Sequence, residues 1–294
     1  MQRIVPNLWF ARDAEEAVDF YADAFPAFTV LKTERYPEEN LPDFQQEFAG
    51  KILTIEFAIE DFRFIAINAG DEFRPNSSIS FLVNFDPSHD PKARDHLNEL
   101  YAKLVKDGHA LMPLDAYPHS PLYGWVEDKY GVSWHLILTD PEGDPRPFII
   151  PSFTFSGPAE GKAGEGVTYY TSVFDGNVGI FALYAQGDPQ AGQLMFGDFT
   201  LFDQWFTAMD NSTQDITFTP GVSLMVECDD QAEIDYLWEA LSAVPEAEAC
   251  GWCIDQFGLS WQIVPRDIDN LVSRPGAYQR LLNMKKININ ELLG

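Results

Sequence analysis

The sequence predicts an α+β protein made of four βαβββ units, which form two domains with curved mixed sheets and with helices on the outer faces. Three observations support this fold class. The stretch Gly124–Leu138 returns in altered form as Gly251–Pro265, which indicates an internal duplication. In each half, the spacing of apolar residues twice follows the order of strand, helix and further strands. A length of 294 residues also suits two domains.

The first unit is expected within the first 68 residues. Apolar residues favour a strand at Ile4–Phe10. The stretch Asp13–Phe25 has acidic residues in its first turn and apolar residues at helical spacing, and Pro26 ends it, which together predict a helix. Three further strands are expected at 28–35, 51–60 and 61–68.

The second unit is expected to begin with a strand at Ile79–Phe85 and to continue with a helix at His96–Lys106. Its remaining strands are predicted near 111–114, 124–127 and 132–139. The Pro-rich run Pro141–Pro147 interrupts regular structure and marks a boundary. The predicted domains are therefore residues 1–146 and 147–294. We expect the two units of each half to share one eight-stranded sheet that encloses a cleft.

The second half repeats this order from Phe148 onward. Its first helix, near 169–174, should be short because several glycines crowd the approach to it. A second helix is expected at Gln231–Leu241, and a Leu-rich closing helix at Ala277–Leu293. Strands are expected at 148–155, 178–184, 193–202, 205–210 and 222–228, and around Trp252 and Trp261.

Composition limits the classes of partner. The formal net charge is −27, and the stretch from Ala163 to Pro265 contains no Lys, Arg or His, so nucleic-acid binding is excluded. This acidity either keeps the protein soluble or repels anionic ligands from the second half. No apolar run approaches the ~18 residues of a membrane span, and the N-terminal segment lacks the zones of a secretory signal. We therefore expect a cytoplasmic protein with no membrane partner.

The cysteines are expected to be reduced and buried. Cys250 and Cys253 form a Cys-Gly-Trp-Cys pattern, but the surrounding pattern indicates strand, turn and strand rather than the strand and helix of a redox site. Residues three apart on a strand also point to opposite faces. Neither a second Cys pair nor a nearby His is present to complete a zinc site.

Several segments resemble the vicinal oxygen chelate superfamily, which includes glyoxalase I, extradiol dioxygenases and bleomycin-resistance proteins, and most closely its PhnB-like branch. They are both copies of the Gly-Trp phrase, Leu8–Phe10, Ala14–Tyr21, Phe64–Asn68, Ile79–Asn84, Glu233–Glu239 and Met284–Ile289. The resemblance spans nearly the whole chain and implies two glyoxalase-like domains. Most members of the branch are half this length and are thought to pair as dimers. The resemblance thus implies that the two halves of this chain form a pseudo-dimer. Such a chain can be monomeric in solution.

Members of the branch often carry the name of a demethylubiquinone methyltransferase. The residues here do not support a nucleotide-type methyl-donor site, because no Gly-x-Gly-x-Gly turn joins a strand to a helix.

The resemblance also implies where a metal ion would bind. Catalytic members hold a divalent ion with His, Glu or Gln from four strands of a paired module. The matching positions are Pro6 or Asn7, Asn68, Ser78 and His135 in the first half, and Pro151 or Ser152, Asp210, Gly221 and Gln262 in the second. Neither half offers three good ligands, and one histidine among amides and hydroxyls would hold Zn²⁺ or Fe²⁺ poorly. No cofactor is therefore predicted, and a divalent metal is kept as the alternative.

The candidate ligand-binding residues are His135, Asn7, Trp9 and Asn68. Strand alternation places His135 on one face with Ser133 and Ile137, and it groups Asn7 with Trp9. The sequence names no catalytic residue.

Three functional hypotheses follow from these positions. The first is a protein that binds a small neutral or cationic molecule, without a tightly held metal, in an aromatic and amide-lined cleft of the first half. The alternative is a metal-dependent lyase, isomerase or dioxygenase using His135 with Asn68 and a nearby acid. The third is that the second half has lost any site and serves as a structural partner.

Overall fold

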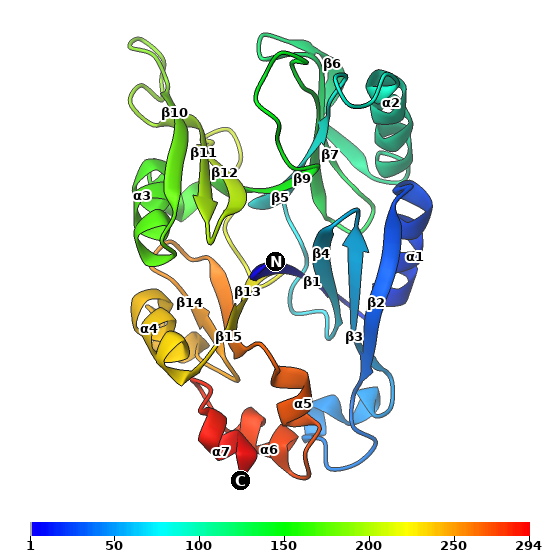
Figure 1. The fold of residues 1–294 in the computed structure, drawn as a ribbon, viewed down its shortest axis with the longest axis vertical. Coiled ribbons are helices and arrows are strands. Elements are labelled where there is room, and N and C mark those ends of the chain that lie inside the picture. Colours follow the sequence, from blue (N-terminus) through cyan, green and yellow to red (C-terminus); the bar gives the residue numbers. More distant parts are fainter. Residues whose placement is uncertain (1) are drawn as a thin grey trace.

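The computed structural model describes residues 2–294, which form two mixed sheets with helices on their outer faces (Figure 1). Sheet A has seven strands, in the order β14 (Trp252–Ile254), β15 (Ser260–Pro265), β13 (Val222–Cys228), β1 (Ile4–Phe10), β4 (Phe62–Asn68), β3 (Ile52–Ile59) and β2 (Phe28–Arg35). Sheet B has eight, in the order β10 (Asn177–Leu183), β11 (Leu194–Leu201), β12 (Gln204–Asp210), β9 (Ile149–Phe155), β5 (Ile79–Phe85), β8 (Ser133–Leu138), β7 (Ser120–Glu127) and β6 (His109–Tyr117).

Four longer helices cover the sheets. They are α1 (Ala14–Ala24), α2 (Ala93–Leu104), α3 (Ala163–Val173) and α4 (Gln231–Leu241). Short 3₁₀ turns occur at Asp43–Phe48, Gly157–Ala159 and Pro245–Ala247. Helix α2 thus begins three residues earlier than expected, and β6 and β7 are longer than expected. None of the helices within residues 2–294 is long and apolar enough to cross a membrane.

Each sheet is shared between the two halves of the chain. Strand β1 pairs with β13 in antiparallel fashion, and β5 pairs with β9 in the same way. The first unit therefore joins the fourth, and the second joins the third. The expectation that both units of one half form one sheet is wrong. The division of the chain into domains at residues 1–146 and 147–294 stays a prediction. It marks the place where the sequence repeat begins again.

Within each half, the two units meet through their helix-side cores instead. Trp134 on β8 packs against Phe25 and Phe64 of the first unit, with ring centroids 5.1 and 6.2 Å away. Trp134 and its counterpart Trp261 are almost fully buried, as expected from the sequence. Burying such large rings is a major source of stability, at roughly 25 cal/mol per Å² of apolar surface.

A buried carboxylate explains why the Gly-Trp phrase recurs. Asp128 accepts hydrogen bonds from the Tyr21 hydroxyl on α1 (3.0 Å), Trp134 Nε1 (2.9 Å) and the backbone nitrogens of Tyr130 (2.9 Å) and Val132 (3.2 Å). Burial raises the pKa of Asp128 to about 6, although these hydrogen bonds oppose the shift. The second copy repeats the network with Asp255, Tyr170, Trp261, Phe257 and Leu259. The phrase thus builds a turn that anchors the first helix of each half.

Helix α3 is eleven residues long, so the prediction of a short helix is wrong. Gly164 and Gly166 lie inside it rather than before it. A Cβ atom on Gly166 would lie 2.5 Å from the Phe155 ring, so the glycine lets the helix approach β9 closely. This packing outweighs the low helix propensity of glycine.

The C-terminal tail, residues 266–294, forms three short helices instead of one. They are α5 (Ile268–Val272), α6 (Ala277–Leu282) and α7 (Ile289–Leu293). Gly276, with a φ of 73°, separates the first two. The carbonyls of Met284 and Lys285 accept hydrogen bonds from the backbone nitrogens of Cys250 and Gly251, at 2.7 Å each, and hold the chain extended before α7.

The tail spans one opening of sheet A, from β15 to the loop before β3 (Figure 1). Leu271 and Ile287 of the tail pack with Val264 in a small apolar cluster. Polar links complete the attachment: Lys32 pairs with Asp269, Tyr278 with Gln45, and Gln279 with the Asn40 carbonyl.

The cysteines are free thiols within the described residues. Cys228 and Cys253 are buried as expected, and burial raises the pKa of each thiol to about 12. Cys250 is only half-buried. Cys253 lies on β14, in the strand context expected from the sequence.

Candidate functional site

The face of sheet B that points away from the helices carries a row of polar side chains. His135 on β8 lies opposite Leu82 of β5, and Ser80 of β5 lies opposite Ser152 of β9. Ser152 in turn lies opposite Thr207 of β12. Paired residues share a face of the sheet, so these polar groups form a row across four neighbouring strands. We refer to this surface as the inner face of sheet B.

His135 stands at one end of the row. Its Nδ1 lies 2.6 Å from the Tyr123 hydroxyl and its Nε2 lies 2.8 Å from Ser80 Oγ. The ring stacks on Trp125 at a centroid distance of 4.6 Å, and Trp125 donates to Ser133 Oγ. Burial, with His119 adding a smaller effect, lowers the pKa of His135 to about 3. The imidazole is therefore neutral at physiological pH and can donate from only one nitrogen.

Three buried hydroxyl groups further along the same face have no hydrogen-bond partner among the described residues. They belong to Ser152, Thr154 and Thr207. Each residue is at most 2% exposed. Thr154 follows Ser152 by two positions on β9, so it shares the inner face with the other two. A buried polar group without a partner costs about 1–3 kcal/mol, so three of them on one face set this part of the sheet apart from the rest of the core.

The charges next to this row are balanced. Asp198 on β11 lies opposite Thr207, and its carboxylate is 3.0 Å from Arg146 Nη2. The Arg146 guanidinium also lies 4.3 Å from the ring centroid of Trp205. The inner face of sheet B therefore offers uncharged donors and acceptors with a neutralised ion pair at one side.

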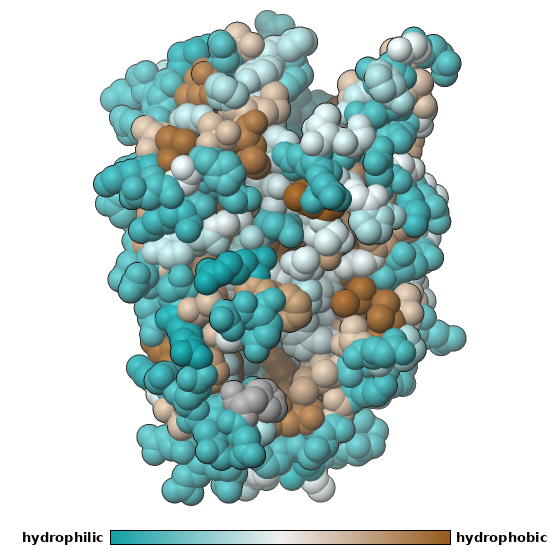
Figure 2. Space-filling model, turned by 180° about the vertical axis from the view of Figure 1, so that it is seen from behind, coloured by the Kyte–Doolittle hydropathy of each residue, from teal (hydrophilic) through white to brown (hydrophobic). Residues whose placement is uncertain are grey.

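The inner face of sheet B has an opening to solvent. In Figure 1 the two ends of the sheet, β10 and β6, rise on opposite sides of the central strands β5 and β9. The space-filling view shows a notch between these two lobes at the top of the molecule (Figure 2). Half-buried Leu82, Trp205 and Met209 also lie on this face, around the fully buried hydroxyls.

The corresponding face of sheet A differs in both chemistry and access. Gln262 takes the place of His135 and donates to Ser223 Oγ at 3.0 Å. Asn7 lies opposite Ser223 and donates to the Val5 carbonyl at 3.0 Å. Met225 and Val264, on the same face, pack against the C-terminal tail. The polar groups of this face are therefore paired within the protein, and the tail covers part of it.

Trp9 is also on the inner face of sheet A. Its Nε1 donates to the Gly70 carbonyl at 2.8 Å, and its ring meets those of Phe73 and Trp252 edge-on. Asn7 and Trp9 are thus brought together, as the alternation predicted, but in a different sheet from His135.

Asn68 lies on the helix side of sheet A, opposite Phe10. Its Oδ1 accepts from the Ala14 nitrogen (3.4 Å) and its Nδ2 donates to Glu15 Oε2 (2.8 Å), so it supports the start of α1. Asp210 does the same for α3 through the Ala163 nitrogen. The four candidate residues therefore occupy three places, and the cleft expected within the first half is not formed. The sequence analysis did not single out Thr154 and Thr207. Alternation of polar and apolar residues on β9 points to Thr154, but β12 has no such alternation that would point to Thr207.

The donor set of sheet B does not fit a tightly held divalent metal. Both nitrogens of His135 are engaged by hydroxyls, and the neighbouring groups are neutral alcohols, which are weak ligands for Zn²⁺ or Fe²⁺. Nowhere within residues 2–294 do three or more His, Cys, Asp or Glu side chains gather in a way that could hold a metal ion.

Known proteins are similar to this chain in sequence or in fold. The family described as 3-demethylubiquinone-9 3-methyltransferase matches residues 2–137 and again residues 147–264. A PhnB protein from Bacillus cereus is 31% identical over 47% of this chain and the whole of its own, with a TM-score of 0.40. Glyoxalase I from Zea mays is 12% identical over 92% of this chain and 96% of its own, with a TM-score of 0.54. No curated protein matches the chain.

The glyoxalase I likeness shows the fold over nearly the whole chain, and the double family match shows that the PhnB-like unit is present twice. With each sheet shared between halves, the two copies form a pseudo-dimer within one molecule. The chain therefore belongs to the PhnB-like family described as 3-demethylubiquinone-9 3-methyltransferase, as a tandem member with the vicinal oxygen chelate fold.

Proposed function

We propose that the inner face of sheet B binds a small uncharged molecule with an aromatic body and hydrogen-bonding groups, without a tightly held metal ion. The observation that carries this proposal is the set of unpaired buried hydroxyls on Ser152, Thr154 and Thr207, on the same face of sheet B as His135. Hydroxyls both donate and accept, so they suit alcohol, phenol, quinone or amide groups. Trp205, which is half-buried on the same face, supplies aromatic surface.

An uncharged ligand is favoured over a charged one. The neutral imidazole of His135 and the alcohol side chains carry no charge, and Asp198 and Arg146 neutralise each other. Moving an ion from water onto such a surface would be costly because no opposite charge is free to compensate it.

Replacing Thr207 with Val tests this proposal. Because Thr207→Val removes an unpaired buried hydroxyl and keeps nearly the same shape, we expect the free protein to be unchanged or more stable by about 1 kcal/mol. We expect the same change to weaken ligand binding by about tenfold, which is one lost hydrogen bond. Chemical denaturation measures the first effect. Calorimetric titration with hits from a panel of neutral phenols, quinones and aromatic amides measures the second.

Ser223→Ala on sheet A is the matched control. Ser223 already accepts a hydrogen bond from Gln262, so its loss should destabilise the protein by about 1 kcal/mol and leave ligand binding unchanged. A Thr207→Val protein that binds every panel hit as tightly as the wild type would contradict the proposal.

The same thermal-shift panel separates the rival functions. Zn²⁺, Fe²⁺ and Ni²⁺ test the metal-dependent lyase, isomerase or dioxygenase. S-adenosylmethionine tests the methyl transfer named in the family description. A ligand present at ~100 times its dissociation constant stabilises the folded protein by about 2.7 kcal/mol, so binding of a metal ion or of S-adenosylmethionine would give a clear thermal shift. We expect neither the metal ions nor S-adenosylmethionine to stabilise the protein in this way.

A further inference from the structure

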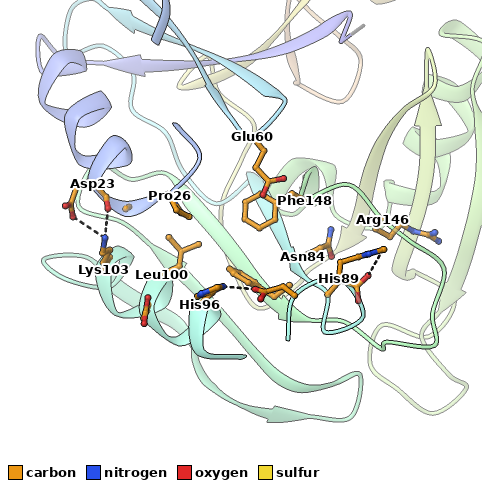
Figure 3. A pocket seen from close by; sticks show the side chains of 15 residues that line it. Asp23, Pro26, Glu60, Asn84, His89, His96, Leu100, Lys103, Arg146 and Phe148 are labelled. Carbon is orange, nitrogen blue, oxygen red and sulfur yellow. Dashed lines mark hydrogen bonds and ion pairs between the residues drawn. The ribbon is translucent and has the colours of Figure 1, made fainter. Parts of the chain in front are cut away.

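A cavity lies beyond the end of β5, apart from the row of hydroxyls on the inner face of sheet B. It has a volume of about 500 Å³ and lies among the end of α1, the turn between β3 and β4, the end of β5, helix α2 and the segment before β9 (Figure 3). Its apolar lining comes from Ala24, Pro26, Phe85, Leu100 and Phe148. The ring of Phe148 meets Phe85 edge-on at 5.6 Å. None of these residues belongs to the site proposed above.

The internal repeat provides a second copy of this place with which to compare it. The Asn84 nitrogen donates to the Phe148 carbonyl at 2.8 Å, and the Glu227 nitrogen donates to the Arg3 carbonyl at 3.0 Å. Phe148 and Arg3 therefore occupy matching positions in front of β9 and β1.

The turns above these two residues also match. Glu60 follows β3 and Phe202 follows β11, and both have left-handed backbone angles, with φ of 53° and 49°. Glu60 thus stands where the repeat has Phe202.

In the second copy, an arginine of the chain itself fills the space. The Arg3 guanidinium lies 4.0 Å from the centroid of the Phe202 ring. Its Nη2 is 2.6 Å from Glu233 Oε1 and 3.3 Å from the Glu227 carbonyl. The fold therefore already holds an organic cation at this position, between an aromatic ring and a carboxylate.

In the first copy the cation is missing, but groups that attract one are present. Phe148 replaces Arg3, and a carboxylate, Glu60, replaces the ring of Phe202. Figure 3 shows the Glu60 side chain extending toward the Phe148 ring. Glu60 makes no ion pair with the described residues, and partial burial at the rim, with Asp61 nearby, raises its pKa. Asn84 is nine-tenths buried in the lining; its Nδ2 donates to the Pro147 carbonyl, and no described residue donates to its Oδ1.

The charges of the lining favour a cation as well. Five carboxylates line the cavity, on Asp23, Glu60, Asp86, Asp90 and Glu99. The two permanently charged cations, Lys103 and Arg146, are already engaged. Lys103 bonds to the Asp23 carbonyl and lies 3.5 Å from its carboxylate, and Arg146 pairs with Asp198 outside the cavity. Asp90 is held by His96 at 2.6 Å. Asp86 accepts a hydrogen bond from the Ser88 nitrogen at 2.7 Å and lies 3.8 Å from His89 Nε2, which leaves Glu60 and Glu99 to meet a ligand.

We propose that this cavity is a second binding site, which takes a small organic cation with an ammonium or guanidinium group on an apolar body. The charged group would lie between Glu60 and the Phe148 ring, with the Asn84 carbonyl oxygen as an acceptor. The apolar body would lie against Leu100, Pro26 and Phe85. A carboxylate beside an aromatic face is a favourable setting for such cations, and the apolar floor adds burial.

Three probes of nearly equal size test the proposal by calorimetric titration of the full chain: benzylammonium, benzyl alcohol and benzoate. Only benzylammonium is expected to bind. Glu60→Gln should weaken its binding by about tenfold or more, because an exposed-rim carboxylate is replaced by a neutral amide of the same shape. Asp61→Asn is the matched control, since it removes the same charge one residue away without touching the cavity lining, and it should have little effect.

Phe148→Arg provides an independent test, because it copies the arrangement of Arg3 into the cavity. We expect this variant to abolish benzylammonium binding without lowering the melting temperature. Glu60 is exposed, so Glu60→Gln remains informative even where Phe148→Arg does not fold.

Three results would overturn the proposal: no benzylammonium binding at about 10 mM, equal binding of benzyl alcohol, or equal binding by Glu60→Gln. Thr207→Val should leave benzylammonium binding unchanged, so failure here and failure of the inner-face proposal are distinguishable.

Discussion

Residues 1–147, produced without the second half, are expected to form a homodimer rather than a monomer. Strands β1 and β5 both lose their antiparallel partners, because β13 and β9 come from the second half. The exposed ladders run over Ile4–Leu8 and Ile79–Val83. Two copies of the fragment can satisfy both edges if β1 of one copy pairs with β5 of the other.

Size-exclusion chromatography with light scattering gives the measurement. We expect a mass near the 33.2 kDa of the intact chain. Production together with residues 148–294 should instead give a one-to-one complex of the two fragments, which serves as the control. A stable, folded monomer of residues 1–147 would show that the sheets do not depend on sharing between the halves.

Asp128→Asn is expected to destabilise the protein by about 3 kcal/mol. Four donors converge on this buried carboxylate. An amide has one accepting oxygen, and its NH₂ group would face either two backbone nitrogens or the Trp134 nitrogen and the Tyr21 hydroxyl. At least one buried donor would lose its partner, at about 1–3 kcal/mol, and two donors would be forced together. Urea unfolding measures the change.

Two further variants serve as controls for Asp128→Asn. Asp255→Asn breaks the repeated network and should cost a similar amount. Asp203→Asn makes the same chemical change in an exposed turn with a left-handed backbone that Asn tolerates, and it should stay within about 0.5 kcal/mol of the wild type. Equal stability of Asp128→Asn and Asp203→Asn would contradict the proposed role of the network.

The destabilisation by Asp128→Asn should also depend on pH. The folded pKa of Asp128 is about 6, above its ordinary 3.8, so the folded state holds the proton more tightly than the unfolded state. Its contribution is therefore fully present below about pH 3.8 and is lost as the pH rises through about 6, by up to about 3 kcal/mol. A protonated oxygen can donate to the Tyr21 hydroxyl and still accept from Trp134. The difference between wild type and variant should thus shrink from pH 4 to pH 7.

Much of the architecture could be read from the sequence because each unit carries its own pattern. Helical spacing located α1 and α4, and alternation correctly placed His135 with Ser133 on one face of β8. The partner of β1 could not be read. The same apolar face is buried whether β1 pairs with its own half or with β13, so periodicity does not distinguish the two arrangements.

The candidate site was harder to predict for a related reason. Alternation groups residues by face, but it does not say which face lies under a helix. Asn68 therefore looked like a partner for Asn7 and Trp9, yet it faces α1. The unpaired hydroxyls of Ser152 and Thr207 form one polar surface only when β9 and β12 lie side by side.

The joining of two copies into one polypeptide has a consequence for how the molecule can specialise. In a dimer of identical chains, every substitution appears twice, so the inner faces of both sheets must change together. Here one gene encodes the two faces separately: the inner face of sheet B carries His135 and Tyr123, and that of sheet A carries Gln262 beneath a C-terminal segment that exists only once. Fusion thus allows the inner face of one sheet to acquire new chemistry while the inner face of the other is free to take a purely structural role.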